Sequence, residues 1–238
     1  MILYGRNVVR EFLSGGGKIY ELFVLEKAKD AEDIISRARK KGIKISFLDK
    51  RSLDKKAGTD KHQGMLINAE GPRSCGIDEF LEKHRDEEEI TAVIIDGVTD
   101  PGNLGAIIRS CEIFGCCGII MALKNTAPVN DAVFKASAGA VNHIDIVKES
   151  NINNVIKRMK KAGFWIYGLD LKGDKFLDET EFDRRTALIL GSEGEGMKKL
   201  VKENCDFLIR IRQKGRLDSL NVSNAAAIVL YENMKQKS

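Results

Sequence analysis

Residues 92–109 read Ala-Val-Ile-Ile-Asp-Gly-Val-Thr-Asp-Pro-Gly-Asn-Leu-Gly-Ala-Ile-Ile-Arg, and this stretch decides the fold class. Its first part, Ala92–Asp96, is almost entirely apolar and predicts a strand. A turn rich in glycine and proline follows, and residues 104–114 have the apolar spacing of a helix. Strands that are apolar on both faces are typical of parallel sheets covered by helices. The stretch therefore predicts one strand–turn–helix unit of an α/β fold.

The same alternation continues from this unit toward both ends of the chain. Downstream strands are predicted at 118–122, 143–147, 164–169, 187–190 and 207–211, and helices at 130–137, 152–162, 197–204 and 222–235. Upstream, strands are predicted at 20–26, 44–48 and 65–69, and a basic helix at 31–41.

The chain of 238 residues is long enough for two modest domains. Residues 89–238 predict a parallel sheet with helices on both faces, and residues 1–70 predict a separate, small α/β domain. Between them, residues 71–88 contain turn-forming glycines, a proline and an acidic run. They predict a linker, with a short helix around Phe80 and Leu81.

The positive charge of the chain is concentrated near its N-terminus. Residues 1–70 hold 15 Lys and Arg against 10 Asp and Glu, whereas the remainder holds 24 against 25. Within 37–61 the counts are 10 and 3. A basic patch attracts the phosphate backbone of RNA, so Arg39, Lys40 and Lys41 are candidate RNA-binding residues. The alternative interpretation is a solvated helix face rich in lysine.

Several classes of protein are disfavoured by composition. The cysteine count is five, no Cys-x-x-Cys occurs, and the three histidines are far apart, so we expect neither a disulfide framework nor a metal site. The apolar runs are only strand-length, which predicts no membrane span. The N-terminus lacks the basic-then-apolar pattern of a signal peptide, and we expect a cytoplasmic protein.

Three polar, glycine-rich segments follow predicted strands, at 96–105, 191–196 and 215–224. Ligands of open parallel sheets bind beyond the carboxyl ends of the strands. Each segment alone could be a tight turn or a helix cap, but three at one edge of a sheet favour a binding site. None of them has the G-x-G-x-x-G or phosphate-loop pattern, which disfavours dehydrogenases and kinases.

The order and spacing of these segments resemble a known family. Asp96–Arg109, Leu190–Met197 and Ser219–Ser223 look like the three motifs of the SpoU (SPOUT-class) RNA 2′-O-methyltransferases. Tyr4-Gly-Arg-Asn7 and His62-Gln-Gly64 are similar to the substrate-binding domain that precedes the catalytic domain in that family. The resemblance thus covers nearly the whole chain, and it is strongest to bacterial enzymes that methylate a guanosine ribose of 23S ribosomal RNA.

The resemblance implies a fold and an activity. The expected fold is α/β, a parallel sheet with helices on both faces and a C-terminal trefoil knot that holds S-adenosylmethionine. A small α/β RNA-binding domain, resembling ribosomal proteins of the L30 and L7Ae types, precedes it. The expected enzyme is a homodimer with its active site near the subunit interface, and it transfers a methyl group to a ribose 2′-hydroxyl of 23S ribosomal RNA. Two alternatives stay open: the same reaction on transfer RNA, and a knotted RNA-binding protein without catalysis.

The resemblance also assigns residues. Asn103 and Arg109 match polar positions of the first motif, Glu193 the glutamate of the second, and Ser219 and Asn221 the polar pair of the third. These five are the expected catalytic residues.

The expected cofactor contacts, made largely through backbone groups, are Gly191, Ile211 and Leu220. Arg212-Gln213 replaces the usual Pro-Met of the family, so the cofactor loop is more polar than the family pattern. Small or aliphatic residues of the family are replaced at three further positions, Arg216, Asp218 and Asn224.

Overall fold

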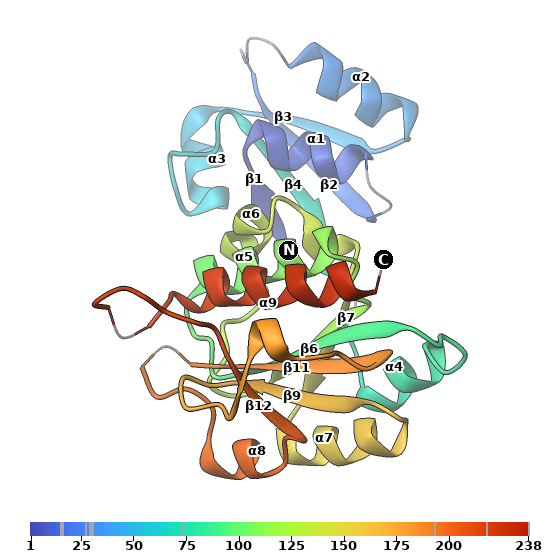
Figure 1. The fold of residues 1–238 in the computed structure, drawn as a ribbon. Helices are drawn as coiled ribbons and strands as arrows, with labels where there is room; N and C mark the ends of the chain where they lie inside the picture. Colours follow the sequence, from blue (N-terminus) through green and yellow to red (C-terminus); the bar gives the residue numbers. More distant parts are fainter. Residues whose placement is uncertain are drawn as a thin grey trace.

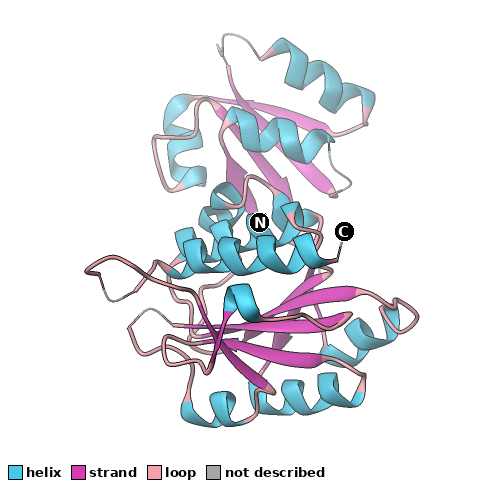
Figure 2. Ribbon diagram, viewed as in Figure 1, coloured by secondary structure: helices cyan, strands magenta, loops and turns pink. Residues whose placement is uncertain are grey.

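The computed structural model describes residues 1–14, 17–26, 28, 31–72, 74–192, 194–217 and 219–237. Two sheets, each with its own helices, lie one above the other (Figures 1 and 2). The α/β class predicted from the strand–turn–helix alternation is confirmed. No helix in the described ranges is long and apolar enough to span a membrane.

The N-terminal sheet has four strands in the order β1-β4-β2-β3. Its strands are β1 (Ile2–Tyr4), β2 (Ile19–Leu25), β3 (Lys44–Leu48) and β4 (Met65–Ala69), and its helices are α1 (Arg6–Ser14), α2 (Glu32–Lys40) and α3 (Lys50–Ala57). Side chains alternate between the faces of β2. Leu22 packs with α1 and α2, whereas Phe23 packs with Leu53 of α3. Helices therefore cover both faces of this small sheet.

The second sheet has eight strands in the order β10-β12-β9-β11-β6-β7-β8-β5, and every neighbouring pair is parallel. The strands are β5 (Ser74–Cys75), β6 (Ile90–Asp96), β7 (Gly118–Ala122), β8 (Asp145–Glu149), β9 (Trp165–Leu169), β10 (Lys175–Phe176), β11 (Arg185–Gly191) and β12 (Phe207–Arg210). The central strand β6 is buried along its whole length, as its apolar sequence predicts.

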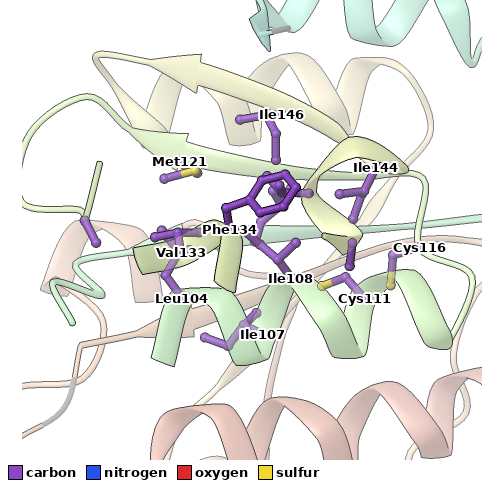
Figure 3. Packing of buried hydrophobic residues seen from close by; sticks show 14 of the residues in the cluster. Leu104, Ile107, Ile108, Cys111, Cys116, Met121, Val133, Phe134, Ile144 and Ile146 are labelled. Atoms are coloured by element: carbon purple, nitrogen blue, oxygen red, sulfur yellow. The ribbon is translucent and has the colours of Figure 1, made fainter. Parts of the chain in front are cut away.

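Helices cover both faces of this sheet as well. One face carries α5 (Pro101–Ile113), α6 (Asp131–Ala136) and α9 (Val222–Gln236), with the short 3₁₀ helix η1 (Ala140–Asn142). The other carries α4 (Ile77–Lys83), α7 (Ile152–Lys161) and α8 (Lys199–Glu203), and a second 3₁₀ helix, η2 (Leu177–Glu179), follows β10. Figure 3 shows the first face, where Phe134 lies among Ile108, Ile144 and Ile146.

The helix after β6 begins one turn earlier than predicted. Asp100 is its N-cap, with a side-chain oxygen that accepts a hydrogen bond from the Asn103 N–H at 2.7 Å. Pro101 occupies the first helical position, where its missing N–H has no cost. The turn of the sequence motif is thus short, and Asn103 lies in the first turn of α5.

The segment predicted as a linker, 71–88, is largely part of the second sheet unit. Ser74 pairs with Ile146 of β8, and α4 buries Ile77 and Phe80 in the core on the α7 side. The short helix predicted around Phe80 and Leu81 is α4, whereas the two-residue strand β5 is too short to produce a periodic pattern, which is why the segment as a whole looked like a connection.

The two units share one continuous apolar core. The rings of Phe12 on α1 and Phe134 on α6 have their centroids 5.1 Å apart, and Lys135 on α6 lies over the ring of Tyr4. One cluster of buried side chains includes residues of both sheets. The N-terminal unit therefore rests on the α5–α6 face of the second unit (Figure 1).

Candidate active site

A cavity of about 490 Å³ lies beyond the carboxyl ends of β9, β11 and β12, where the strand-end rule places ligands. Its lining comes from the end of β9 (169–172), the end of β11 and the following loop (190–192 and 194–196), Lys202, Ile211, residues 219–222, and Ala225. Segments distant in the sequence thus meet in one hollow.

The glycine-rich loop after β11 forms one wall of the cavity. Ser192 and Gly196 exchange two backbone hydrogen bonds, of 3.1 and 3.0 Å, which close the loop. A Cβ atom at Gly191 would lie 2.7 Å from the carbonyl oxygen of Gly196 and closer still to the backbone of Met197. Gly191 is therefore required by the close approach of two backbone segments. Glu193, the predicted catalytic glutamate, lies outside the described residues.

A buried carboxylate anchors the far end of this loop. Asp96, at the end of β6, accepts a hydrogen bond from the Lys198 N–H at 2.9 Å, and its other oxygen lies 3.3 Å from Nζ of Lys198. Asp96 is only 2% exposed. The start of the first motif thus contacts the residue that directly follows the second motif.

The first and third motifs also meet. Nδ2 of Asn221 donates a hydrogen bond to Oδ1 of Asn103 at 3.0 Å. Asn221 is the N-cap of α9, and its Oδ1 accepts hydrogen bonds from the N–H and hydroxyl of Ser223 at 2.9 and 2.6 Å. Both amides are therefore held in fixed orientations at the start of their helices.

The structure brings part of the predicted catalytic and cofactor-binding set to the cavity. Five of them line it: Gly191, Ile211, Ser219, Leu220 and Asn221. Asn103 is tied to this group through Asn221.

Arg109 is not part of the lining. It lies about 9 Å further along α5 than Asn103 and is exposed. Glu11 of α1 is close enough to interact with it electrostatically. Burial raises the pKa of Glu11, and the positive charges of His143 and Arg109 partly oppose that rise. Arg109 therefore lies where the two units meet.

Arg39, Lys40 and Lys41 are distant from the cavity. All three are exposed at the C-terminal end of α2, at the outer end of the N-terminal unit (Figure 1). They do not line the cavity.

The departure at Arg212 falls outside the cavity. Its guanidinium binds the carboxylate of Asp178 at 2.9 and 3.0 Å, also contacts Glu179, and stacks 3.6 Å from the centroid of Phe176. The hydrogen bond from Arg212 lowers the pKa of Asp178. The added charge is thus neutralised at η2, and the cavity wall keeps only Ile211 from this region.

Sequence reasoning missed an ion pair in the cavity lining, formed by Asp170 and Lys202. Asp170, directly after β9, lies 2.5 Å from Nζ of Lys202 on α8, and it also accepts a hydrogen bond from the Lys172 N–H at 2.9 Å. Burial alone would raise the pKa of Asp170, but these hydrogen bonds outweigh it and leave the pKa below its usual value. A polar residue at the end of a predicted strand was the available signal.

The described residues contain no group of three His, Cys, Asp or Glu side chains that could hold a metal ion.

Known proteins resemble the chain over its full length. The sequence pattern of the SpoU rRNA Methylase family matches residues 91–231, and that of RNA 2′-O ribose methyltransferase substrate binding matches residues 2–75. YacO of Bacillus subtilis (strain 168), named as belonging to the TrmH family of tRNA/rRNA methyltransferases, is 32% identical over 237 residues, which are 98% of this chain and 95% of YacO. A TrmH family protein of Staphylococcus haemolyticus is 31% identical, over 100% of this chain and 96% of its own length.

Solved structures share the fold. An rRNA methyltransferase from Sinorhizobium meliloti, crystallised with S-adenosylmethionine, superposes with a TM-score of 0.80 at 27% identity, over 98% of this chain and 86% of that one. The SpoU methyltransferase AviRb from Streptomyces viridochromogenes has a TM-score of 0.82 at 22% identity, over 100% and 90% of the two chains, and supports the fold alone.

Proposed function

The chain belongs to the SpoU rRNA methylase family, and from this premise we propose that it transfers a methyl group from S-adenosylmethionine to a ribose 2′-hydroxyl of RNA. The observation that carries the proposal is the hydrogen bond between Asn103 and Asn221 beside a glycine-walled cavity. It joins two of the three motif segments at the mouth of one pocket. The N-terminal unit, whose sequence matches the substrate-binding pattern, is the proposed RNA-binding domain.

S-adenosylmethionine is the cofactor, and the cavity fits it. Gly191 presents bare backbone, without a side chain, to the cavity, and Ile211 and Leu220 add apolar walls. When bound, the cofactor supplies a methyl group already activated by a sulfonium. We assign Gly191, Ile211 and Leu220 to holding it, so the remaining task of the chain is to align the ribose and remove the hydroxyl proton.

We assign the RNA side of the reaction to Asn103, Arg109, Glu193, Ser219 and Asn221. Asn103 and Asn221 orient polar groups at the cavity through their mutual hydrogen bond. A guanidinium has a pKa above ~12 and normally only donates hydrogen bonds, so Arg109 suits a bidentate clamp on the RNA phosphate. Another acceptor or a water then takes the proton.

The proposed substrate is a guanosine of 23S ribosomal RNA, and Arg39, Lys40 and Lys41 are proposed to bind its backbone. Transfer RNA is the second candidate, because the relatives from Bacillus and Staphylococcus are named for both RNA classes. The proposed place of action is the cytoplasm.

We also propose the family's trefoil knot. β12 lies between β9 and β10 in the sheet, so the segment from β9 through β10 to β11 passes around it. A Cβ atom at Gly173, in this segment, would lie 2.7 Å from the backbone of Ile209 and 2.8 Å from that of Leu208. The segment thus crosses directly over β12, which supports a threaded C-terminus.

A homodimer is proposed through the outer face of α9. Large apolar side chains are exposed there and on the neighbouring end of α5: Ile228, Tyr231 and Ile113 are 40%, 53% and 61% exposed. A helix that is apolar on both sides is typical of one buried by a second chain. Ile228→Asp should give monomers in sedimentation analysis, and a dimer that persists would contradict this interface.

The decisive experiment maps ribose methylation on ribosomal and transfer RNA from cells that lack the gene. The purified protein should restore the missing methyl group from S-adenosylmethionine, and a 2′-deoxy substitution at that nucleotide should abolish transfer. Binding of S-adenosylmethionine with no transfer to any RNA would refute the enzyme and favour a knotted RNA-binding protein.

A further inference from the structure

An ion pair is built into the wall of the cavity, and no step of the proposed reaction uses it. Asp170 and Lys202 both line the cavity, and their charged atoms lie 2.5 Å apart. The side chains are 10% and 32% exposed, so the pair is largely withdrawn from bulk water. Removing charges from water has a cost, and such a pair in a binding cavity calls for an explanation.

The pair is held rigidly. Oδ1 of Asp170 accepts a hydrogen bond from the Lys172 N–H at 2.9 Å, which fixes the carboxylate relative to the end of β9. Lys202 lies on α8, which Val201 anchors in the core. The Lys202 ammonium also lies under the glycine-rich loop, about 4.0 Å from the Cβ position of Gly196. The two charged groups are therefore preorganised before any ligand enters.

The pair lies away from the place proposed for methyl transfer. Asn103 and Asn221 meet near the end of β6, whereas Asp170 ends β9, and β11 separates these strands. Two inter-strand spacings amount to about 10 Å. A cofactor whose methyl group lay beside Asn103 and Asn221 would therefore meet this pair with a part remote from that methyl group.

The charges of Asp170 and Lys202 indicate which part of the cofactor would lie beside them. The amino-acid end of S-adenosylmethionine carries a carboxylate and an ammonium, and the adenosine end carries uncharged ribose hydroxyls. A ligand carboxylate alone beside Lys202 would also lie beside Asp170, and a ligand ammonium alone beside Asp170 would also lie beside Lys202. The whole zwitterion, turned antiparallel to the pair, could match both charges, but two more charges would then have to leave water.

Hydroxyls meet no such penalty. An ammonium has three donors and a carboxylate has about four acceptor positions, so both groups retain capacity beyond their mutual contact. A ribose diol can accept from Lys202 and donate to Asp170 at once. We propose that Asp170 and Lys202 recognise the ribose hydroxyls of the cofactor's adenosine. This inference rests on the proposed function, since it takes the cavity as the cofactor site.

The test measures ligand affinity by calorimetry in three variants of the full-length protein. Lys202→Met removes the donor, and Asp170→Asn keeps an oxygen for the Lys172 N–H but removes the charge. Lys199→Met is the matched control on the same helix, because that side chain is 91% exposed. The ligands are S-adenosylhomocysteine, 5′-methylthioadenosine, which lacks the amino-acid group, and the 2′-deoxy form of S-adenosylhomocysteine.

We expect Lys202→Met and Asp170→Asn to weaken the binding of S-adenosylhomocysteine and of 5′-methylthioadenosine by the same factor. The factor should be about 10- to 100-fold, because each variant loses a hydrogen bond to a charged group. For the 2′-deoxy ligand, the wild-type protein should already bind more weakly, and the variants should add little. Lys199→Met should match the wild type with every ligand.

Three outcomes would overturn the inference. A loss confined to S-adenosylhomocysteine would assign the pair to the amino-acid group. An equal loss for all three ligands would indicate a structural role only, and no loss would remove the pair from the binding site. Failure of the wild-type protein to bind any of the ligands would instead refute the cofactor site itself, and with it the proposed function.

Discussion

Replacing Gly191 by alanine adds one methyl group where two backbone segments touch. The new Cβ atom would lie 2.7 Å from the Gly196 carbonyl oxygen, whereas ordinary contacts begin at 3.4 Å. The obstacle is backbone rather than a flexible side chain, and the Gly196 carbonyl carbon and the Met197 nitrogen lie closer still, so the loop itself must move by more than about 0.7 Å. Gly191 and Gly196 both line the cavity, and the movement therefore changes the cofactor wall.

The size of the effect follows from the cost of overpacking. Forcing an extra carbon into a packed site costs about 1–3 kcal/mol. If relief of the clash moves the loop out of its binding position, the dissociation constant for S-adenosylmethionine rises about 5- to 150-fold. If the loop cannot move, the same energy lowers the melting temperature by about 2–4 °C per kcal/mol. Affinity loss with little change in melting temperature is the expected result.

Calorimetry and thermal melts on three variants separate the causes. Gly215→Ala adds a methyl group in open space and should behave as the wild type. Gly194→Ala also meets no neighbour, but its φ of +90° makes alanine strained. If Gly191→Ala binds S-adenosylmethionine like the wild type, the close-approach reasoning is wrong. Gly191 itself has no positive φ, so an equal loss in Gly194→Ala would indicate that any distortion of this loop weakens binding, and that the contact at Gly191 is not the specific cause.

Three further predictions follow from charge and packing. Burial lowers the pKa of Lys237 to about 8, below the 10.5 of the unfolded chain, so between these values the unfolded state binds more protons and stability rises with pH. The melting temperature of the wild type relative to Lys237→Met should rise across that window, and a constant difference would contradict it. Arg109→Lys should bind RNA more weakly and react slowly at every pH in single-turnover assays, because lysine lacks the planar fork; a rate rising toward the lysine pKa would favour proton removal instead. A fragment of residues 71–238 should melt cooperatively. The shorter fragment 89–238 lacks buried Phe80, and its free energy of unfolding should be lower by at least about 3–5 kcal/mol. Equal stability of the two fragments would be inconsistent with the role of α4 in the core.

Strongly periodic segments were predictable from the sequence. The strand predicted at 118–122 coincides with β7, because five consecutive residues are buried or nearly so. The helix predicted at 152–162 coincides closely with α7, whose buried side chains recur at helical spacing. In contrast, α3 was missed because Leu53 is its one buried side chain. Its cap signals were present, since Asp49 accepts a hydrogen bond from the Ser52 N–H and Gly58 follows with positive φ.

The candidate site was predictable only in part. The strand-end rule and the family resemblance together pointed to the segments that hold Asn103, Gly191 and Asn221. They could not show that Asp170 and Lys202 form a pair, because each lies on a different element and no local pattern relates them. Nor could they show that Arg212 is neutralised by acidic residues of η2, which removes the apparent conflict with the family pattern.

The packing of Phe12 against Phe134 has a consequence for how a nucleotide is chosen. A shared core resists rotation of one unit against the other, so the separation between the end of α2 and the cavity is set by the protein. If the N-terminal unit binds RNA as proposed, a fixed distance separates the bound RNA element from the site of methylation. The enzyme would then methylate the nucleotide that lies at this distance from the bound element. Lengthening or shortening the intervening RNA should abolish methylation of that nucleotide or shift methylation to a neighbouring nucleotide.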